Sequence, residues 1–322
     1  MRVRRLWLTD FRNYRELDLA FDEGLTAVVG ANGQGKTNLV EALAYLSRLG
    51  SFRGTPTDMM IRSGTPHAVV RAEVLHDDGR ELLIEAELPR NGRQRVQVNR
   101  QRITRNRDLL GVFRVTVFSP DDLELVKDGP GARRTFIDET LVNLNPRLDG
   151  LLTDLDRILK QRAALLKQLG GRLTAETEMT LDVWDTKLVE VGEQLGAERA
   201  RVMALLEPLV MASYAALATR PATIVLTYAP EWRAEGLAAA LRAARDGDLR
   251  RQITSVGPHR DDIGLWLNDL PARATASQGE SRTLALALRL AAHELLRLEH
   301  RESPVLILDD RSEEHTSELQ SQ

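Results

Sequence analysis

Residues 30–37 combine the residue types and the spacing that bind phosphate groups. The segment reads Gly-Ala-Asn-Gly-Gln-Gly-Lys-Thr and matches the template G-x-x-x-x-G-K-[ST]. Glycines let backbone N–H groups turn toward phosphate oxygens, and a following helix adds its positive dipole end. Lys36 would bridge the outer phosphates, and the Thr37 hydroxyl would hold Mg²⁺. The segment predicts a nucleotide site whose loop contacts come from Gly30, Ala31, Asn32, Gly33, Gln34, Gly35, Lys36 and Thr37.

An acidic pair near the end of the chain fits the same chemistry. Residues 305–308 read Val-Leu-Ile-Leu, which predicts a buried strand, and Asp309 and Asp310 follow it. Asp309 would bind Mg²⁺, and Asp310 is placed to activate an attacking water. Strands often end in Asp without any catalytic role, so the pattern carries weight only together with the phosphate loop. The two together predict a Walker A and Walker B pair.

A third segment could bind an anion at the start of a helix. Ser277, Gln278 and Gly279 precede a long amphipathic stretch at residues 281–298. A small hydroxyl, a glycine and a helix N-terminus together favour negative charge. The alternative is that Ser277 only caps the helix. Its position shortly before the Walker B strand favours a functional role.

The elements that must position these residues change in type along the chain. Strands are expected at residues 2–8 and 17–21, joined through 11–14, then a buried strand at 25–29 and a helix over 39–46. Further strands are expected at 68–75, 81–88 and 95–98, with hairpin turns at Asp78-Gly79 and Asn91-Gly92. From 134 to about 218 the apolar residues follow helical spacing. Two stripes, at 148–166 and 181–209, flank Gly170-Gly171 and predict a helical hairpin. The stripes favour core packing over a partner-binding surface. A strand at 222–228 and a short helix at 236–244 come after them.

Composition limits the class of protein. A chain of 322 residues suggests two lobes, and the absence of cysteine excludes disulfides and thiolate metal sites. No targeting segment is expected at the start, and no stretch is expected to reach the roughly 20 apolar residues of a membrane span. We therefore expect a cytoplasmic protein. The net charge of −3 does not by itself indicate a nucleic-acid-binding protein.

Arginines gather in one stretch that has no acidic residue before Asp108. They are Arg90, Arg93, Arg95, Arg100, Arg102, Arg105 and Arg107. Such a cluster could neutralise DNA phosphates, with Arg93, Arg95, Arg100 and Arg102 as the predicted contacts. The alternative is a solvated face in an arginine-rich protein, and the two interpretations remain equally open. No aromatic residues are interleaved, so sequence-specific readout is not expected.

The motifs together resemble the RecF family of ABC ATPases, which have a head of the SMC type. The resemblance is carried, in family order, by residues 11–14 (Phe-Arg-Asn-Tyr), 30–43, 51–53 (Ser-Phe-Arg), 117–123, 257–262 (Gly-Pro-His-Arg-Asp-Asp), 277–286 and the Walker B pattern. It implies ATP and Mg²⁺ as cofactors, slow ATP hydrolysis and an ATP-dependent homodimer. It also implies binding to gapped, single- or double-stranded DNA, and cooperation with RecR and RecO in loading recombinase at single-strand gaps. Ser277, Gln278 and Gly279 match the signature that caps the nucleotide of the other subunit. By analogy with related heads, Arg12 and Arg53 approach the nucleotide.

The fold class implied is α/β. We expect a P-loop ATPase lobe I with a mixed sheet, at residues 1–118 and 256–310, and an inserted, mainly helical lobe II at 119–255. Residues 311–322 break with the preceding pattern and are expected to be a non-native tail in place of the family's D-loop. Asp310 stands where most ABC ATPases have Glu, and no Q-loop glutamine is assigned.

An ABC subunit that energises a transporter is the alternative, which the long helical insertion disfavours. A purely structural tether of the SMC kind would need longer arms.

Overall fold

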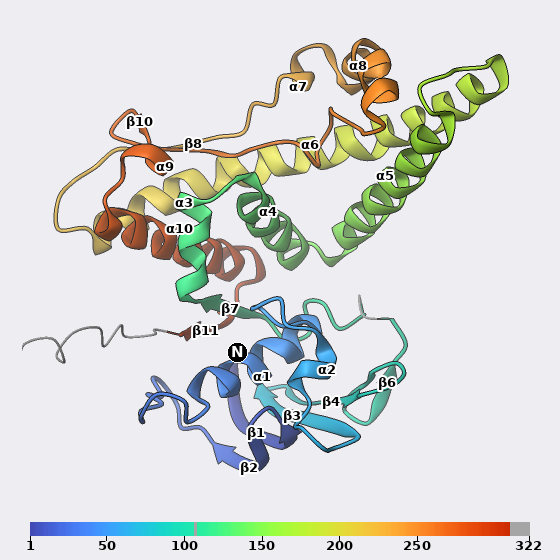
Figure 1. Ribbon diagram of the computed structural model, residues 1–322. Helices are drawn as coiled ribbons and strands as arrows, with labels where there is room; N and C mark the ends of the chain where they lie inside the picture. The colour runs from blue at the N-terminus through green and yellow to red at the C-terminus, as the bar shows by residue number, and fades with distance from the viewer. Residues whose placement is uncertain (106–107, 310–322) are drawn as a thin grey trace, which may run out of the picture. The chain divides into compact units, whose positions relative to one another are not determined.

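The structure is a computed structural model that describes residues 1–105 and 108–309 (Figure 1). The chain divides into two compact units. Unit 1 contains Met1–Asp122 together with the residues from Leu296 onward, and unit 2 contains Leu123–Leu295.

Unit 1 is built on a six-stranded antiparallel sheet. Its order is β2-β1-β3-β4-β5-β6, formed by β1 (Arg2–Phe11), β2 (Tyr14–Ala20), β3 (His67–Leu75), β4 (Glu81–Pro89), β5 (Arg95–Val98) and β6 (Gln101–Ile103). Alternation of apolar and polar residues puts one face in the core. Leu6, Ala72 and Ile84 are cross-strand neighbours and fully buried, whereas the next row, Trp7, Arg71 and Glu85, lies on the opposite face. The structure confirms the strands expected at residues 2–8, 17–21, 68–75, 81–88 and 95–98, together with the two hairpin turns. Strand β6 was not expected.

Two helices and a separate strand pair complete unit 1. Helix α1 (Lys36–Arg48) contributes Leu39, Leu43 and Leu46 to the same core as the sheet, and α2 (Thr57–Met60) is a single turn. Strands β7 (Val115–Phe118) and β11 (Val305–Leu308) pair in parallel. The Walker B strand thus lies beside a strand nearly two hundred residues earlier in the chain.

The expected strand at residues 25–29 is not formed, which corrects the prediction. Leu25 and Val29 are 95% and 88% exposed, and residues 25–29 have no strand assignment. The physical reason is the lack of a partner, because among the described residues no strand pairs with residues 25–29, and β11 pairs only with β7. An isolated strand leaves its backbone groups unpaired. For the same reason β11 is only partly buried, with Ile307 inside and Leu308 57% exposed.

Unit 2 is mainly helical. Its helices are α3 (Glu124–Lys127), α4 (Pro130–Leu144), α5 (Asp149–Leu169), α6 (Ala175–Leu217), α7 (Trp232–Glu235), α8 (Leu237–Arg251), α9 (Ala272–Thr275) and α10 (Gln278–His300), with 3-10 turns at Pro120–Leu123 and Pro146–Leu148. Helices α5 and α6 pack as the predicted hairpin, with Leu166, Leu181 and Leu249 buried together. A three-stranded sheet in the order β10-β9-β8 joins β8 (Ile224–Thr227), β9 (Gly264–Leu267) and β10 (Leu270–Pro271).

The compact units differ from the expected lobe division at both internal boundaries, which lie at 122/123 rather than 118/119 and at 295/296 rather than 255/256. Residues 256–295, which the sequence division places in lobe I, cluster with the helical unit. Strand β9 pairs with β8, and Leu288 of α10 lies beside Phe136 of α4 and Met203 of α6. These contacts hold the signature segment among the helices.

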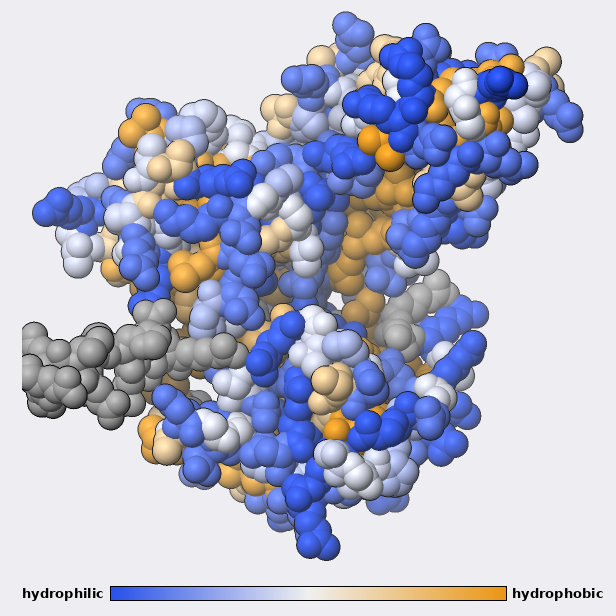
Figure 2. Space-filling model, viewed as in Figure 1, coloured by the Kyte–Doolittle hydropathy of each residue, from blue (hydrophilic) through white to orange (hydrophobic). Residues whose placement is uncertain are grey.

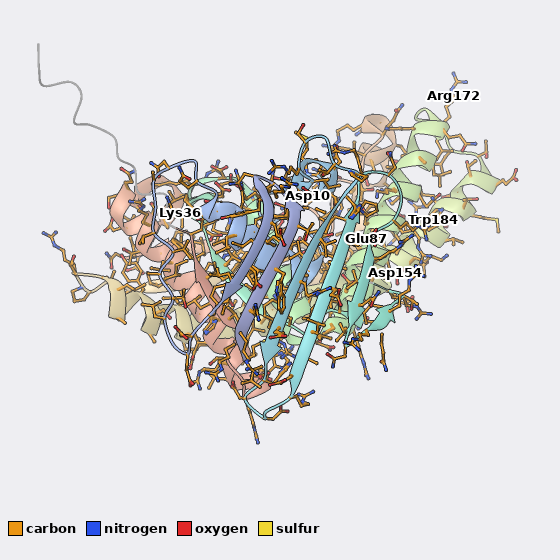
Figure 3. All side chains as sticks on the ribbon, turned by 90° about the horizontal axis from the view of Figure 1, so that it is seen from below. Asp10, Lys36, Glu87, Asp154, Arg172 and Trp184 are labelled. Atoms are coloured by element: carbon orange, nitrogen blue, oxygen red, sulfur yellow. The ribbon has the colours of Figure 1, made fainter. Side chains whose placement is uncertain are left out.

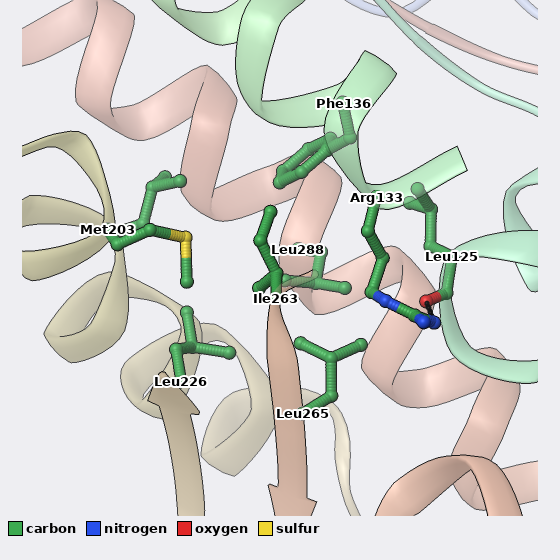
Figure 4. Close-up of a pocket in the computed structure, with 9 residues that line it drawn as sticks. Leu125, Arg133, Phe136, Met203, Leu226, Ile263, Leu265 and Leu288 are labelled. Atoms are coloured by element: carbon green, nitrogen blue, oxygen red, sulfur yellow. Dashed lines mark hydrogen bonds between the residues drawn. The ribbon is translucent and has the colours of Figure 1, made fainter. Parts of the chain in front are cut away.

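Those same side chains line a small cavity in unit 2 (Figure 4). Its walls are aliphatic and aromatic, and the Arg133 guanidinium at the edge donates to the Leu125 carbonyl at 3.1 Å. The space has room for about one water molecule. We therefore interpret it as a packing defect of the core.

Helix α6 requires a correction to the membrane expectation. Among the described residues, α6 is the one helix that is long enough and apolar enough to cross a membrane, by length and composition alone. One such helix is weak evidence; 28% of its apolar window is buried, and α6 packs against α4, α5, α8 and β8. On the face drawn in Figure 2, hydrophobic side chains show in patches among hydrophilic ones. Met179 and Val183 of α6 are exposed apolar residues.

Candidate functional site

The phosphate loop, residues 30–37, leads directly into helix α1. Gly33 and Gly35 have φ angles of 81° and 102°, which side chains other than glycine rarely adopt. Gly35 is the N-cap of α1, and it caps the helix without a side-chain hydrogen bond. Its carbonyl accepts the N–H groups of Asn38 and Leu39, at 2.9 and 3.1 Å. The helix therefore presents its first N–H groups and its positive dipole end to the loop, as an anion site requires.

The Lys36 ammonium lies at the mouth of this loop. Its Nζ donates to the carbonyl oxygens of Gly30 and Ala31, at 2.5 and 3.0 Å. Figure 3 shows Lys36 beside the loop at the start of α1. Neutral carbonyls satisfy an ammonium group only partly, so phosphate oxygens would compete for it effectively.

Thr37 and Asp309 meet across a sequence separation of 272 residues. The Thr37 hydroxyl donates to Asp309 Oδ1 at 3.1 Å, and the Asp309 N–H donates to the Phe118 carbonyl at 2.8 Å. Asp309 is 8% exposed, which makes it one of the few buried carboxylates of unit 1. A hydroxyl and a carboxylate side by side are the hard oxygen ligands that Mg²⁺ prefers, so these two residues fit the expected metal. Asp310, the predicted catalytic acid, lies outside the described residues.

The hairpin turn between β1 and β2 contacts the phosphate loop from the other side. Asn13 Nδ2 donates to the Gln34 carbonyl at 3.1 Å, and the Tyr14 hydroxyl donates to the Gly35 carbonyl at 3.1 Å. Sequence reasoning used this turn only as part of a resemblance and missed these two residues. A polar turn after a regular strand was the available signal, but it does not say which loop the turn contacts.

Arg12, in the same turn, is committed to another partner. Its guanidinium forms two hydrogen bonds of 2.7 Å to the carboxylate of Glu41 on α1, which is fully buried. A third hydrogen bond of 3.1 Å joins it to the Met59 carbonyl. The Glu41 carboxylate also accepts the Ser51 hydroxyl at 2.5 Å, which in turn accepts the Arg53 N–H. A direct contact of Arg12 or Arg53 with nucleotide stays a prediction.

The signature segment lies in unit 2 and forms a capping box at the start of α10. The Ser277 N–H and hydroxyl donate to one oxygen of Glu280, at 2.8 and 2.7 Å, and the Glu280 N–H donates back to the Ser277 hydroxyl at 3.3 Å. These hydrogen bonds hold the pKa of Glu280 below its usual value. A Cβ on Gly279 would meet no described atom within 4 Å. Packing within the described chain therefore does not require a glycine there.

The arginine cluster is partly engaged within unit 1. Arg90 donates to the backbone carbonyls of Thr65 and Arg62, and Arg95 pairs with Glu87 at 3.5 Å. Figure 3 shows the sheet face-on, with Glu87 labelled on β4. The other predicted DNA contacts are all exposed: Arg93 precedes β5, Arg100 lies in the β5–β6 turn and Arg102 lies on β6. Arg107 lies outside the described residues.

Residues 257–262 form a polar centre of unit 2. The Asp261 carboxylate accepts the Tyr228 hydroxyl at 2.5 Å and the Trp232 indole N–H at 2.7 Å, and burial raises its pKa. Asp262 pairs with Arg133 through two hydrogen bonds of 2.8 and 3.0 Å. The Pro258 carbonyl accepts Arg199 at 2.7 Å. This segment therefore holds the helices of unit 2 together.

Comparison with known proteins places these features in one family. Residues 2–314 match the model described as RecF/RecN/SMC N terminal domain. A protein from Streptomyces avermitilis, named "DNA replication and repair protein RecF", is 44% identical over 325 residues, which cover 96% of this chain and 86% of that protein. A protein of the same name from Frankia alni is 44% identical over 328 residues, with the same coverage.

Solved structures agree with the sequence matches. The "recombination mediator protein RecF-ATP in RecFOR pathway" matches with a TM-score of 0.89 and 30% identity, covering 98% of this chain and 86% of that one. The Smc head domain of Pyrococcus furiosus, bound to the C-terminal domain of ScpA, matches with a TM-score of 0.52 and 17% identity, covering 96% and 89%. The second match shows a shared fold alone, and both agree with the α/β ATPase head expected from the sequence.

Proposed function

The chain belongs to the RecF/RecN/SMC N-terminal family and, within it, to the RecF proteins, and we propose that it is an ATP-dependent DNA-binding repair protein. The observation that carries this proposal is the pairing of Thr37 with Asp309 beside the phosphate loop. A helix N-terminus without a side-chain cap, a lysine and two oxygen ligands are what a Mg²⁺–nucleotide complex needs.

Each residue of this site has a separate task. The backbone N–H groups of residues 30–37 would bind the β- and γ-phosphates, and Lys36 would add a point charge between them. Thr37 and Asp309 would hold Mg²⁺, which neutralises phosphate charge when bound. Asp310 would orient and deprotonate the attacking water. Because its carboxylate is one methylene shorter than the Glu usual in ABC ATPases, we infer slow hydrolysis.

Dimerisation on ATP would bring the signature of one subunit to the nucleotide of the other. Support comes from the start of α10, where Gly279 has open space around its α-carbon and Ser277 lies at a helix N-terminus. The Ser277 hydroxyl now serves Glu280, so it would have to exchange that partner for phosphate. The exchange would keep an anionic acceptor on the hydroxyl, and it requires the Glu280 carboxylate to move away, because two anions side by side repel.

DNA is the proposed macromolecular partner, in gapped, single- or double-stranded form. The exposed arginines around the β5–β6 hairpin are the proposed contacts, and they would bind phosphates rather than bases. Solved RecF relatives are named as recombination mediators in the RecFOR pathway. By the same relationship we propose that this protein acts with RecR and RecO in the cytoplasm to help load recombinase at single-strand gaps.

The decisive experiment removes the Lys36 charge. Lys36→Ala should abolish ATP binding, measured by equilibrium dialysis, because the ammonium between the phosphates is lost while no core residue changes. Lys160→Ala, which removes an exposed lysine of unit 2, is the matched control and should bind ATP like the parent chain. Unchanged ATP affinity in Lys36→Ala would remove the nucleotide-site assignment.

A further inference from the structure

We propose that Asn13 and Tyr14 are positioning residues that hold the phosphate loop in its binding conformation. The inference rests on the proposed ATP function and adds two side chains from the β1–β2 turn to the nucleotide site. Neither side chain needs to touch the nucleotide. Both form hydrogen bonds to the loop backbone from the side of the β1–β2 turn.

The two side chains grip consecutive peptide groups. Asn13 Nδ2 donates to the Gln34 carbonyl and the Tyr14 hydroxyl donates to the Gly35 carbonyl, both at 3.1 Å. The described peptide bonds are all trans, so each carbonyl points opposite to the N–H of the next residue. Holding these carbonyls on the side of the turn therefore aims the N–H groups of Gly35 and Lys36 to the opposite side. Those are the groups that a phosphate-binding loop must present.

The contact is also steric. Gly35 has a φ of 102°, and an added Cβ would lie 2.5 Å from Asn13 Nδ2 and 2.6 Å from its Oδ1. The Asn13 amide thus lies directly against the glycine backbone. A loop pressed on one side and hydrogen-bonded at two adjacent carbonyls has few other conformations available.

The turn can fix the loop only if the turn itself is rigid, and three hydrogen bonds hold it in place. Asn13 Oδ1 accepts Asn38 Nδ2 of α1 at 2.8 Å, so both ends of the amide are used. The Asn13 carbonyl accepts Arg62 at 3.0 Å, and the Arg12 N–H donates to the Met60 carbonyl at 2.7 Å. Together with the Arg12–Glu41 pair, these bonds tie the turn to α1, to the last residue of α2 and to the segment that follows α2.

The test compares nucleotide affinity in Asn13→Ala and Tyr14→Phe with that of the parent chain. Each hydrogen bond contributes about 1 kcal/mol, which corresponds to roughly a fivefold loss of affinity. ATP and ADP should weaken by the same factor, because the N–H groups of Gly35 and Lys36 would bind the β-phosphate that both carry. Asn91→Ala, at an exposed hairpin turn of the same unit, is the matched control and should leave both affinities unchanged.

Thermal unfolding without nucleotide separates positioning from a general structural role. Tyr14→Phe keeps the ring that packs on the core and removes only the hydroxyl, so its melting temperature should fall by no more than the loss of one hydrogen bond allows, about 2–4 °C. Parent-like affinities for ATP and ADP in both variants would overturn the positioning role of Asn13 and Tyr14 while leaving the ATP assignment intact. Failure of the parent chain to bind ATP would instead overturn the proposed function.

Discussion

Substituting Gly196 by Ala tests how closely α6 approaches the segment that Asp261 organises. An added Cβ at residue 196 would lie 2.6 Å from Cη2 of the Trp232 ring and 3.1 Å from its Cζ2. Carbon atoms in contact prefer about 3.5–4.0 Å, so the ring would have to move by about 1 Å. Trp232 cannot move freely, because it is 5% exposed and its indole N–H is bonded to Asp261 at 2.7 Å.

Two effects of opposite sign decide the outcome. Replacing glycine by alanine inside a helix stabilises it by about 1 kcal/mol, whereas overpacking a core costs about 1–3 kcal/mol. Gly247→Ala on α8 provides the matched control, because its Cβ would meet only the far end of the Arg251 side chain, at 3.2 Å. The helix gain is common to both variants. The difference in their free energies of unfolding should therefore report the clash alone, about 1–3 kcal/mol.

Thermal or urea unfolding followed by circular dichroism measures this difference. We expect Gly247→Ala to match or exceed the stability of the parent chain, and Gly196→Ala to melt several degrees below Gly247→Ala. About 2–4 °C per kcal/mol is typical for domains of this size. If Gly196→Ala proves as stable as Gly247→Ala, then Trp232 does not lie against α6 as described, and the packing role given to residues 257–262 is wrong.

Two further predictions concern pH dependence and dimerisation. Burial lowers the pKa of His259 to about 4 from its usual 6.5, so the unfolded chain takes up the proton first as the pH falls. Stability that is complete above about pH 6.5 should be lost toward pH 4, and His259→Gln should flatten that part of a pH–unfolding curve; an unchanged slope would mean that another group titrates. Ser277→Arg should block an ATP-dependent dimer, because the added bulk occupies the place of the partner's phosphate, yet it should spare ATP binding by the monomer. Sedimentation with a non-hydrolysable ATP analogue measures this, and a dimer that survives would leave Ser277 as a helix cap only.

The chemistry of the site could be predicted from the sequence because it depends on local patterns. Glycine spacing and the following helix predict the phosphate loop, and a strand that ends in Asp309 predicts the metal ligand. The Thr37–Asp309 contact then follows from the usual arrangement of these two motifs. The helical hairpin was also predictable, because its periodic stripes extend over many turns.

Other features depend on partners that no local pattern names. The apolar run at residues 25–29 has the composition of an interior strand, but a strand forms only where a neighbour supplies hydrogen bonds. The contacts of Asn13 with Gln34 join segments whose sequences say nothing about each other. Arg162 is fully buried between Asp185 and Asp248, although a single charged residue in an amphipathic stripe is normally expected to face water.

Because α6 is long, a small rotation at one of its ends displaces the other end by a much larger distance. Its 43 residues rise about 1.5 Å each, so the helix spans about 65 Å. A rotation of about 5° at its C-terminal end would sweep the other end through about 6 Å, by the same geometry. Burial and, after it, the nearby Glu280 carboxylate raise the pKa of Tyr214, so the C-terminal end of α6 lies near the signature segment. A probe attached beside Thr174, at the opposite end, would therefore magnify small movements at the start of α10 into displacements large enough to measure.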